Sequence, residues 1–221
     1  MKELKISLSK KTEAKILTEG LKIPKASCEI SIDATFILPK IKNHGLKLDA
    51  VFLSAIAEII YINMPYINVS WLEEEGGPKL ISHENLNFGL ALEAKNGLAV
   101  ATIKDVERKN LWQLNSEIKE LAEKAKQNRL GVSCFKPKPN IVFNNIGIYP
   151  NIARGDSLMQ PWNTLMVSAF RIIETPVVFK GYIMVRPMMN VIAFFDHRPI
   201  DGASAAQFLN LLKEKIENPR F

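Results

Sequence analysis

The segment MNVIAFFDHRPIDGASAAQFLNLLKEKIE, residues 189–217, contains a strand, a short loop and a helix in succession. The apolar run Met189–Phe195 predicts a strand. Asp201 followed by Gly202 is typical of a helix N-cap, so we expect a helix from about Asp201 to Glu217. Its apolar residues at helical spacing are expected to face the core: Ala205, Phe208, Leu209, Leu212 and Ile216.

His197 lies in the loop between this strand and this helix, where a side chain can be held by the scaffold and still reach a cleft. An unperturbed imidazole titrates at a pKa of about 6.5, so a histidine here can take a proton from a hydroxyl or thiol at neutral pH. The alternative is a histidine that only hydrogen-bonds a neighbouring loop. Asp201 is expected to cap the helix, and a pairing with Arg198 would fix the loop around His197.

The rest of the chain shows further alternating and helical patterns. The residues from Cys28 to Leu38 alternate as in a half-buried strand, and Asp49 can cap a helix that Pro65 stops. We also expect a hairpin over Leu86–Ile103 that turns at Lys95-Asn96-Gly97, a helix from about Lys109 to Leu130, and strands at Ile141–Ile146, Thr164–Ile173 and Val177–Val185. Strands and helices do not alternate strictly, which favours an α+β layered domain with an antiparallel or mixed sheet.

Composition excludes several classes of function. The chain has 221 residues and a net charge of 29 − 23 = +6, but its lysines are scattered, which favours a solvated surface over a nucleic-acid interface. No GxGxxG, P-loop or CxxC motif occurs, and no cluster of residues suggests a metal. The two cysteines, Cys28 and Cys134, fit a reducing compartment. No leader-like segment is present, and the apolar stretch Val51–Met64 is too short to cross a membrane, so we expect a cytoplasmic protein.

The loop around His197 resembles a known family. Residues 195–203, FDHRPIDGA, resemble the DHRxxDGA signature of dihydrolipoyl acyltransferases, the catalytic cores of 2-oxo acid dehydrogenase complexes. The hairpin from Leu86, the helix after Asp105 and the segment Pro65–Asn68 are also similar to the family, so the resemblance covers nearly the whole chain. It implies a chloramphenicol acetyltransferase-like two-layer α+β fold, with a mixed, mostly antiparallel sheet and helices packed on it. It also implies a single acyltransferase catalytic domain over residues 1–221, without a lipoyl or peripheral-subunit-binding domain.

The same resemblance implies the chemistry. The matching histidine, His197, deprotonates coenzyme A or dihydrolipoamide, and the thiolate then attacks an acyl thioester. Asp201 matches the family's aspartate. A hydroxyl from a facing subunit stabilises the oxyanion in the family, and this chain has Asn144 at that position, whose amide can also donate a hydrogen bond. The resemblance thus implies a homotrimer with active sites at subunit interfaces, coenzyme A as substrate, a lipoyl group supplied in trans and no metal. Which residues bind coenzyme A is left open.

Three readings of the function stay open. The first is an acyltransferase that uses coenzyme A and a thiol carrier such as dihydrolipoamide, with a lipoyl-carrying protein as a candidate partner. The second is an enzyme like chloramphenicol acetyltransferase that acetylates a small hydroxyl compound, and the third is a catalytically degenerate trimeric scaffold, which Asn144 makes plausible. Because the chain stops at Phe221, where many relatives continue with an apolar tail, we expect a free trimer rather than a larger cage.

Overall fold

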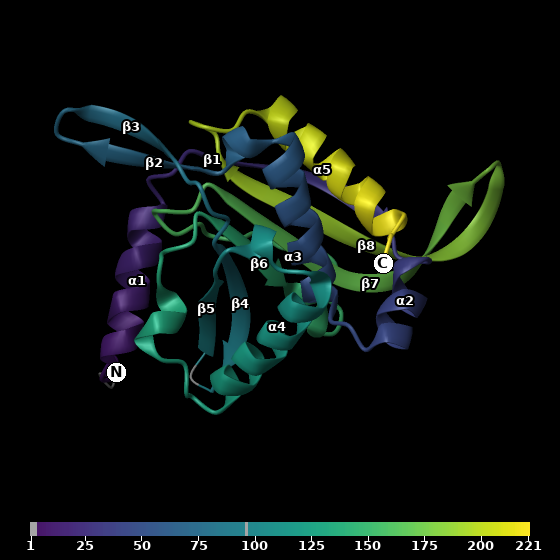
Figure 1. Cartoon of the computed structure of the whole chain (residues 1–221), viewed down its shortest axis with the longest axis horizontal. Helices are drawn as coiled ribbons and strands as arrows, with labels where there is room; N and C mark the ends of the chain where they lie inside the picture. Colours follow the sequence, from purple (N-terminus) through teal and green to yellow (C-terminus); the bar gives the residue numbers. More distant parts are fainter. Residues whose placement is uncertain (1–3, 96) are drawn as a thin grey trace.

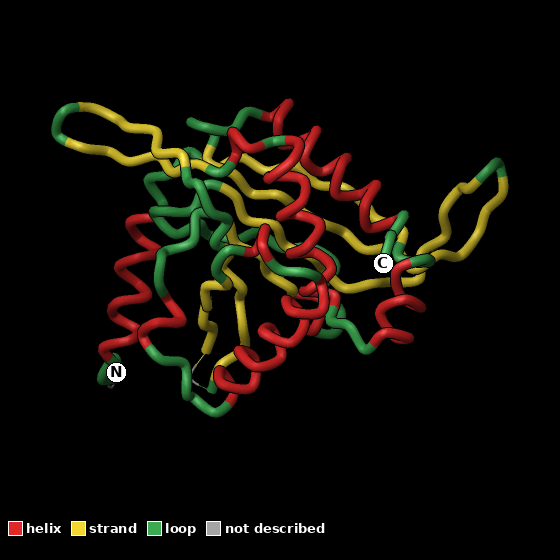
Figure 2. Tube along the Cα trace, viewed as in Figure 1, coloured by secondary structure: helices red, strands yellow, loops and turns green. Residues whose placement is uncertain are grey.

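The computed structural model describes residues 4–95 and 97–221, so the Asn96 position of the expected turn lies outside the described residues. Figures 1 and 2 show a twisted central sheet with helices against it and two hairpins that extend away from the body. The helices are α1 (Leu8–Gly20), α2 (Ile37–His44), α3 (Leu48–Glu58), α4 (Leu111–Lys126) and α5 (Gly202–Glu217). The strands are β1 (Lys25–Asp33), β2 (Val69–Glu74), β3 (Gly77–Ser82), β4 (Phe88–Ala94), β5 (Gly97–Ile103), β6 (Ile141–Asn145), β7 (Leu165–Phe179) and β8 (Tyr182–Asp196).

The main sheet has six strands in the order β1-β8-β7-β6-β4-β5. The pairs β1/β8, β8/β7 and β4/β5 are antiparallel, whereas β7/β6 and β6/β4 are parallel. β2 and β3 form a separate hairpin. This arrangement confirms the expected α+β fold with a mixed, mostly antiparallel sheet.

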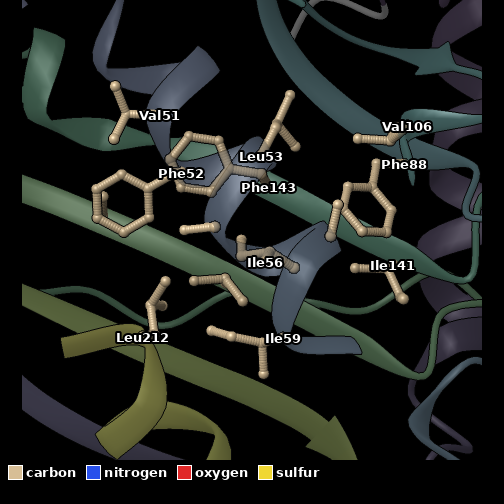
Figure 3. Packing of buried hydrophobic residues seen from close by; sticks show 14 of the residues in the cluster. Val51, Phe52, Leu53, Ile56, Ile59, Phe88, Val106, Ile141, Phe143 and Leu212 are labelled. Atoms are coloured by element: carbon tan, nitrogen blue, oxygen red, sulfur yellow. The ribbon is translucent and has the colours of Figure 1, made fainter. Parts of the chain in front are cut away.

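One face of the sheet packs against α3, α4 and α5 and forms the larger core. Phe52 of α3 stacks on Phe143 of β6, with ring centroids 5.0 Å apart. Figure 3 shows these two rings beside Ile56 and Leu212, which come from α3 and α5. Burial of many such side chains supplies the main driving force for folding, at about 25 cal/mol per Å² of apolar surface.

The opposite face of the sheet carries a smaller apolar cluster, whose members include Val142, Met166, Ile192 and Phe194. Met159, from the segment that connects β6 to β7, belongs to the same cluster. Gly20 at the end of α1 has the Met159 carbonyl oxygen directly against it, so a Cβ would not fit there. The backbone of α1 is thereby held close to this segment.

The prediction for α5 is confirmed, since the helix begins after Asp201 and all five of its expected core residues are buried. The expected helix near residue 109 is also present, but it begins later and ends earlier. Asn110 and Gln113 form a capping box at its start. α1 was not predicted from the sequence. It begins after Ser7, whose side chain caps the helix by accepting a hydrogen bond from the Lys10 amide.

Two strand predictions are wrong at specific turns. The alternation from Cys28 to Leu38 continues past the strand, because the Asp33 carboxylate accepts hydrogen bonds from the Thr35 amide and hydroxyl and turns the chain into α2. The run Val177–Val185 is not one strand either. Lys180 and Gly181 both have positive φ, 50° and 85°, and form the tight turn between β7 and β8.

Asp49 does not cap α3 as expected. Lys47 occupies the N-cap position without a side-chain hydrogen bond, and Asp49 lies in the first turn. The helix passes into a π-helical segment at Ile59–Asn63 before Pro65 begins a short 3₁₀ turn. Within the described residues, no helix is both long and apolar enough to cross a membrane.

Candidate active site

His197 follows the last residue of β8 and precedes α5. Its backbone N–H donates a hydrogen bond of 3.0 Å to the carbonyl oxygen of Pro24, which ties the loop to the start of β1. Its ring lies 5.6 Å from the Phe195 ring, and the residue is exposed. The backbone of His197 is therefore fixed while the imidazole is open to solvent in the single chain.

Arg198 and Asp196 brace this loop from both sides of His197. The Asp196 carboxylate is buried and receives the Arg198 guanidinium through Nη2–Oδ2 at 2.7 Å and Nε–Oδ1 at 2.9 Å. The backbone N–H of Arg198 also donates to Asp196 at 3.1 Å. The hydrogen bond to Asp196, more than any other cause, raises the pKa of Arg198, so the guanidinium stays charged.

The expected pairing of Arg198 with Asp201 is wrong. The remaining Arg198 nitrogen, Nη1, bonds Glu73 of β2 at 2.8 Å, and the guanidinium lies 5.2 Å from the Trp71 ring. Arg198 pairs with Asp196 rather than with Asp201 because Asp196 is only two residues away and buried. The planar guanidinium can donate one hydrogen bond to each oxygen of that carboxylate. The same contacts attach the β2–β3 hairpin to the loop of His197.

Asp201 caps α5, as the sequence predicted. Its carboxylate accepts a hydrogen bond of 2.7 Å from the Ser204 N–H. That backbone hydrogen bond is the main cause that holds the pKa of Asp201 below its ordinary value, with a small contribution from the charge of His197. Asp201 therefore sets where the helix begins.

Asn144 lies in β6, directly beside Ser168 of β7 in the parallel register. Its side chain is half-buried and shares a face with Val142 of the smaller core. The next residue, Asn145, points to the other face, where its Nδ2 donates to the Asp49 carboxylate at 2.9 Å. Asn145 Oδ1 accepts from the Gly147 amide at 3.1 Å, so the end of β6 is tightly held.

Asp49 is a carboxylate of α3 that the sequence did not single out as part of this region. Burial raises the pKa of Asp49 above its ordinary value, although the hydrogen bond from Asn145 acts in the opposite direction. Sequence reasoning missed Asp196, which braces the loop of His197, and also Asp49 and Ser168, which lie beside Asn145 and Asn144. Only Asp196 had a visible signal, because it stands next to His197 in the DHR motif.

His197 and Asn144 do not meet within one chain. Through Ser168, the register places Asn144 in line with Ile192, five residues before His197 on β8. At about 3.3 Å per residue, this is a separation of about 16 Å along the strand, with β7 lying between. A cavity of about 490 Å³ lies between α3 and α5 and another of about 210 Å³ beside α3, but neither is lined by His197 or Asn144.

The described ranges contain no group of three or more histidine, cysteine, aspartate or glutamate side chains placed to hold an ion. The chemistry that the residues themselves offer is that of an imidazole base and of hydrogen-bond donors.

Comparisons with known proteins place the chain in one family. The family described as 2-oxoacid dehydrogenases acyltransferase (catalytic domain) matches residues 1–221. The succinyltransferase component of the mitochondrial 2-oxoglutarate dehydrogenase complex of Bos taurus is 30% identical over 182 residues, which are 81% of this chain and 39% of that protein. The acetyltransferase component of the pyruvate dehydrogenase complex of Rickettsia felis is 28% identical over 178 residues, 80% of this chain and 42% of that protein. The chain thus spans about two fifths of the length of these relatives.

Solved structures agree with this result. A probable dihydrolipoamide acetyltransferase from Listeria monocytogenes has a TM-score of 0.87 at 27% identity and covers 100% of this chain and 97% of its own. A truncated catalytic core of the 2-oxoacid dehydrogenase complex from Thermoplasma acidophilum has a TM-score of 0.86 at 25% identity and covers both chains fully. A chloramphenicol acetyltransferase, with a TM-score of 0.57 at 14% identity over 99% of each chain, shares the fold. With its DHRxxDGA loop, its mixed six-stranded sheet and a family match over its whole length, this chain belongs to the 2-oxoacid dehydrogenase acyltransferases as a catalytic domain.

Proposed function

We propose that this chain transfers an acyl group between coenzyme A and a thiol carrier such as dihydrolipoamide, with His197 as the general base. The observation that carries the proposal is the braced loop at the end of β8. Its backbone is fixed by Pro24, by the Arg198–Asp196 pair and by the Asp201 cap, yet it leaves the His197 imidazole exposed. Such a loop presents a base in a set position without burying it.

The reaction needs a base because a thiol, with a pKa of about 8.5, is mostly protonated at neutral pH. His197 takes the thiol proton, and the resulting thiolate attacks the carbonyl carbon of the acyl thioester. The carbonyl oxygen then carries a negative charge, to which the Asn144 amide donates a hydrogen bond. When the tetrahedral intermediate collapses, the departing thiolate takes the proton back from His197, so protons and charge balance.

The proposal requires two copies of the chain at each site. Asn144 lies about 16 Å along the sheet from His197 within one subunit, so the two can face one reacting group only if they come from different subunits. Closed rings of identical subunits supply such a head-to-tail interface. We therefore propose a homotrimer in which His197 of one subunit faces Asn144 of the next. A lipoyl-carrying protein would present the second thiol.

The test is an acyl-transfer assay with acetyl-CoA and succinyl-CoA as donors. Dihydrolipoamide is the thiol acceptor, read at the thioester absorbance, and chloramphenicol is a hydroxyl acceptor, read by released coenzyme A. We expect transfer to dihydrolipoamide and loss of at least about a thousandfold in His197→Ala, since a base and its proton are both removed. His44→Ala is the matched control, because His44 is an exposed histidine whose ring lies 5.5 Å from that of Trp112.

Each other result contradicts the proposal. Transfer to chloramphenicol alone would assign the chain to hydroxyl acetylation, and the absence of turnover with every donor and acceptor would favour a scaffold. Equal activity of His197→Ala and wild type would remove His197 from the mechanism.

A further inference from the structure

Ser168 is a buried polar residue without a hydrogen-bond partner. Its side chain has 0% exposure, and its Oγ bonds to no atom of the described residues. It lies in β7 among apolar neighbours on the smaller core face, which include Met166, Phe170 and Ile192. Since a buried hydroxyl without a partner costs free energy that alanine would not, an unsatisfied serine here calls for an explanation.

The nearest residue with a polar side chain in the register is Asn144. Asn144 and Ser168 are directly paired between the parallel strands β6 and β7, so their side chains stand on the same face. No hydrogen bond joins the Asn144 side chain to any other described residue. Neighbouring strands are about 4.8 Å apart, so a side-chain rotation is enough to bring the hydroxyl to the carboxamide.

We propose that Ser168 is a positioning residue, whose hydroxyl donates a hydrogen bond to Asn144 Oδ1 when the site is assembled. This inference rests on the proposed acyl transfer. A serine hydroxyl can donate one hydrogen bond. Among the described groups, Asn144 Oδ1 is the acceptor that the strand register places beside the Ser168 hydroxyl.

The direction of this hydrogen bond decides what Asn144 can do. A carboxamide has a donor end and an acceptor end of nearly the same shape, so it stabilises an oxyanion only when Nδ2 points at it. A donor behind Oδ1 holds the amide in that orientation. If it were reversed, the carbonyl oxygen would face the developing negative charge and oppose the reaction.

The kinetic test is Ser168→Ala. We expect kcat to fall about tenfold, the effect of about one hydrogen bond on a barrier, while KM for acyl-CoA stays within a factor of about two. The fold should be as stable as the wild type or more stable, because the variant removes an unsatisfied hydroxyl.

A double-mutant cycle separates positioning from a general structural effect. In an Asn144→Ala background, Ser168→Ala should change kcat no further, because the residue through which it acts is already gone. Thr102→Val is the matched control. Thr102 is a buried strand hydroxyl that already donates to the Pro137 carbonyl at 2.9 Å, so this variant should lose stability and keep its kcat.

The outcomes that overturn the inference differ from those that overturn the proposed function. An active wild type with an unchanged or raised kcat in Ser168→Ala contradicts positioning by Ser168. If the wild type has no turnover, the proposed function fails, and a crystal structure of the assembled protein then decides. Ser168 Oγ within about 3.2 Å of the Asn144 carboxamide oxygen supports the contact, and a separation beyond hydrogen-bond range overturns it.

Discussion

The Arg198 guanidinium holds the buried Asp196 carboxylate in a forked ion pair, with Nη2–Oδ2 at 2.7 Å and Nε–Oδ1 at 2.9 Å. The two residues flank His197, so the pair fixes the backbone from which the imidazole projects. Asp196 is 2% exposed, and the backbone and guanidinium of Arg198 donate hydrogen bonds to both of its carboxylate oxygens.

Removal of Arg198 should therefore destabilise the whole chain. In Arg198→Met, the Asp196 carboxylate is left buried without its partner, and we expect a loss of about 3–5 kcal/mol in the free energy of unfolding. Urea denaturation followed by circular dichroism measures this. The second substitution Asp196→Asn should recover part of the loss, because it removes the buried charge.

The matched control for this pair is Glu73→Gln. Glu73 also binds Arg198, but its side chain is 67% exposed, so the change should cost less than about 1 kcal/mol. If Glu73→Gln and Arg198→Met were equally destabilising, the Asp196 pair would not be what holds the loop.

Asp49 should make stability depend on pH in a defined direction. Burial raises the pKa of Asp49 above 3.8, so the folded chain binds more protons than the unfolded chain just above that pH. The contribution of Asp49 to the free energy of unfolding therefore falls as pH rises from about 4 through its folded-state pKa. Asp49→Asn keeps an acceptor for Asn145 and does not titrate, so the stability of this variant relative to wild type should rise over the same window.

Asp156→Asn supplies the contrast for this experiment. The hydrogen bond from Lys25 is the main cause that lowers the pKa of Asp156, so its contribution to stability is lost as pH falls rather than as pH rises. Denaturation curves collected from about pH 2 to pH 8 compare the two variants, since the Asp156 contribution is lost only below its ordinary pKa of 3.8. A relative stability of Asp49→Asn that stays flat or falls with pH would contradict a raised pKa at Asp49.

The kcat of Asn144 variants should depend on whether the new side chain can donate a hydrogen bond. Asn144→Asp is nearly isosteric but places a carboxylate where the oxyanion forms, so kcat should fall by about 10²–10³. Asn144→Ser keeps a donor, so we expect a loss of less than about tenfold. Steady-state kinetics with dihydrolipoamide check both, and equal losses in the two variants would show that Asn144 does not act as a donor.

The helices and strands around the site could be predicted from the sequence where the capping and apolar patterns predict the same element that core packing favours. In α5, the Asp201 cap and the spacing of Phe208 and Leu212 point to the same helix, and the structure has it. β6 was also predictable to within one residue, because Ile141 and Phe143 fill the core between strands on either side.

Other features depended on contacts that the sequence does not display. The turn at Lys180-Gly181 divides an apolar run whose composition favours a strand throughout, and only backbone conformation reveals it. The partner of Arg198 could not be chosen from spacing, since Asp196 and Asp201 are both close in sequence and Glu73 comes from a distant hairpin. Ser168 became visible only through the register of β6 and β7.

The central claim is that each active site combines His197 of one subunit with Asn144 of another. Co-expression of His197→Ala and Asn144→Ala chains with different affinity tags, followed by purification on both tags, gives mixed oligomers in which some interfaces carry both intact residues. In a closed trimer that contains both kinds of chain, one site of three is intact, so the doubly purified mixture should regain about a third of wild-type acyl transfer to dihydrolipoamide while each variant alone stays nearly inactive. Mixed oligomers as inactive as the single variants, beside an active wild type, would contradict a site shared between subunits.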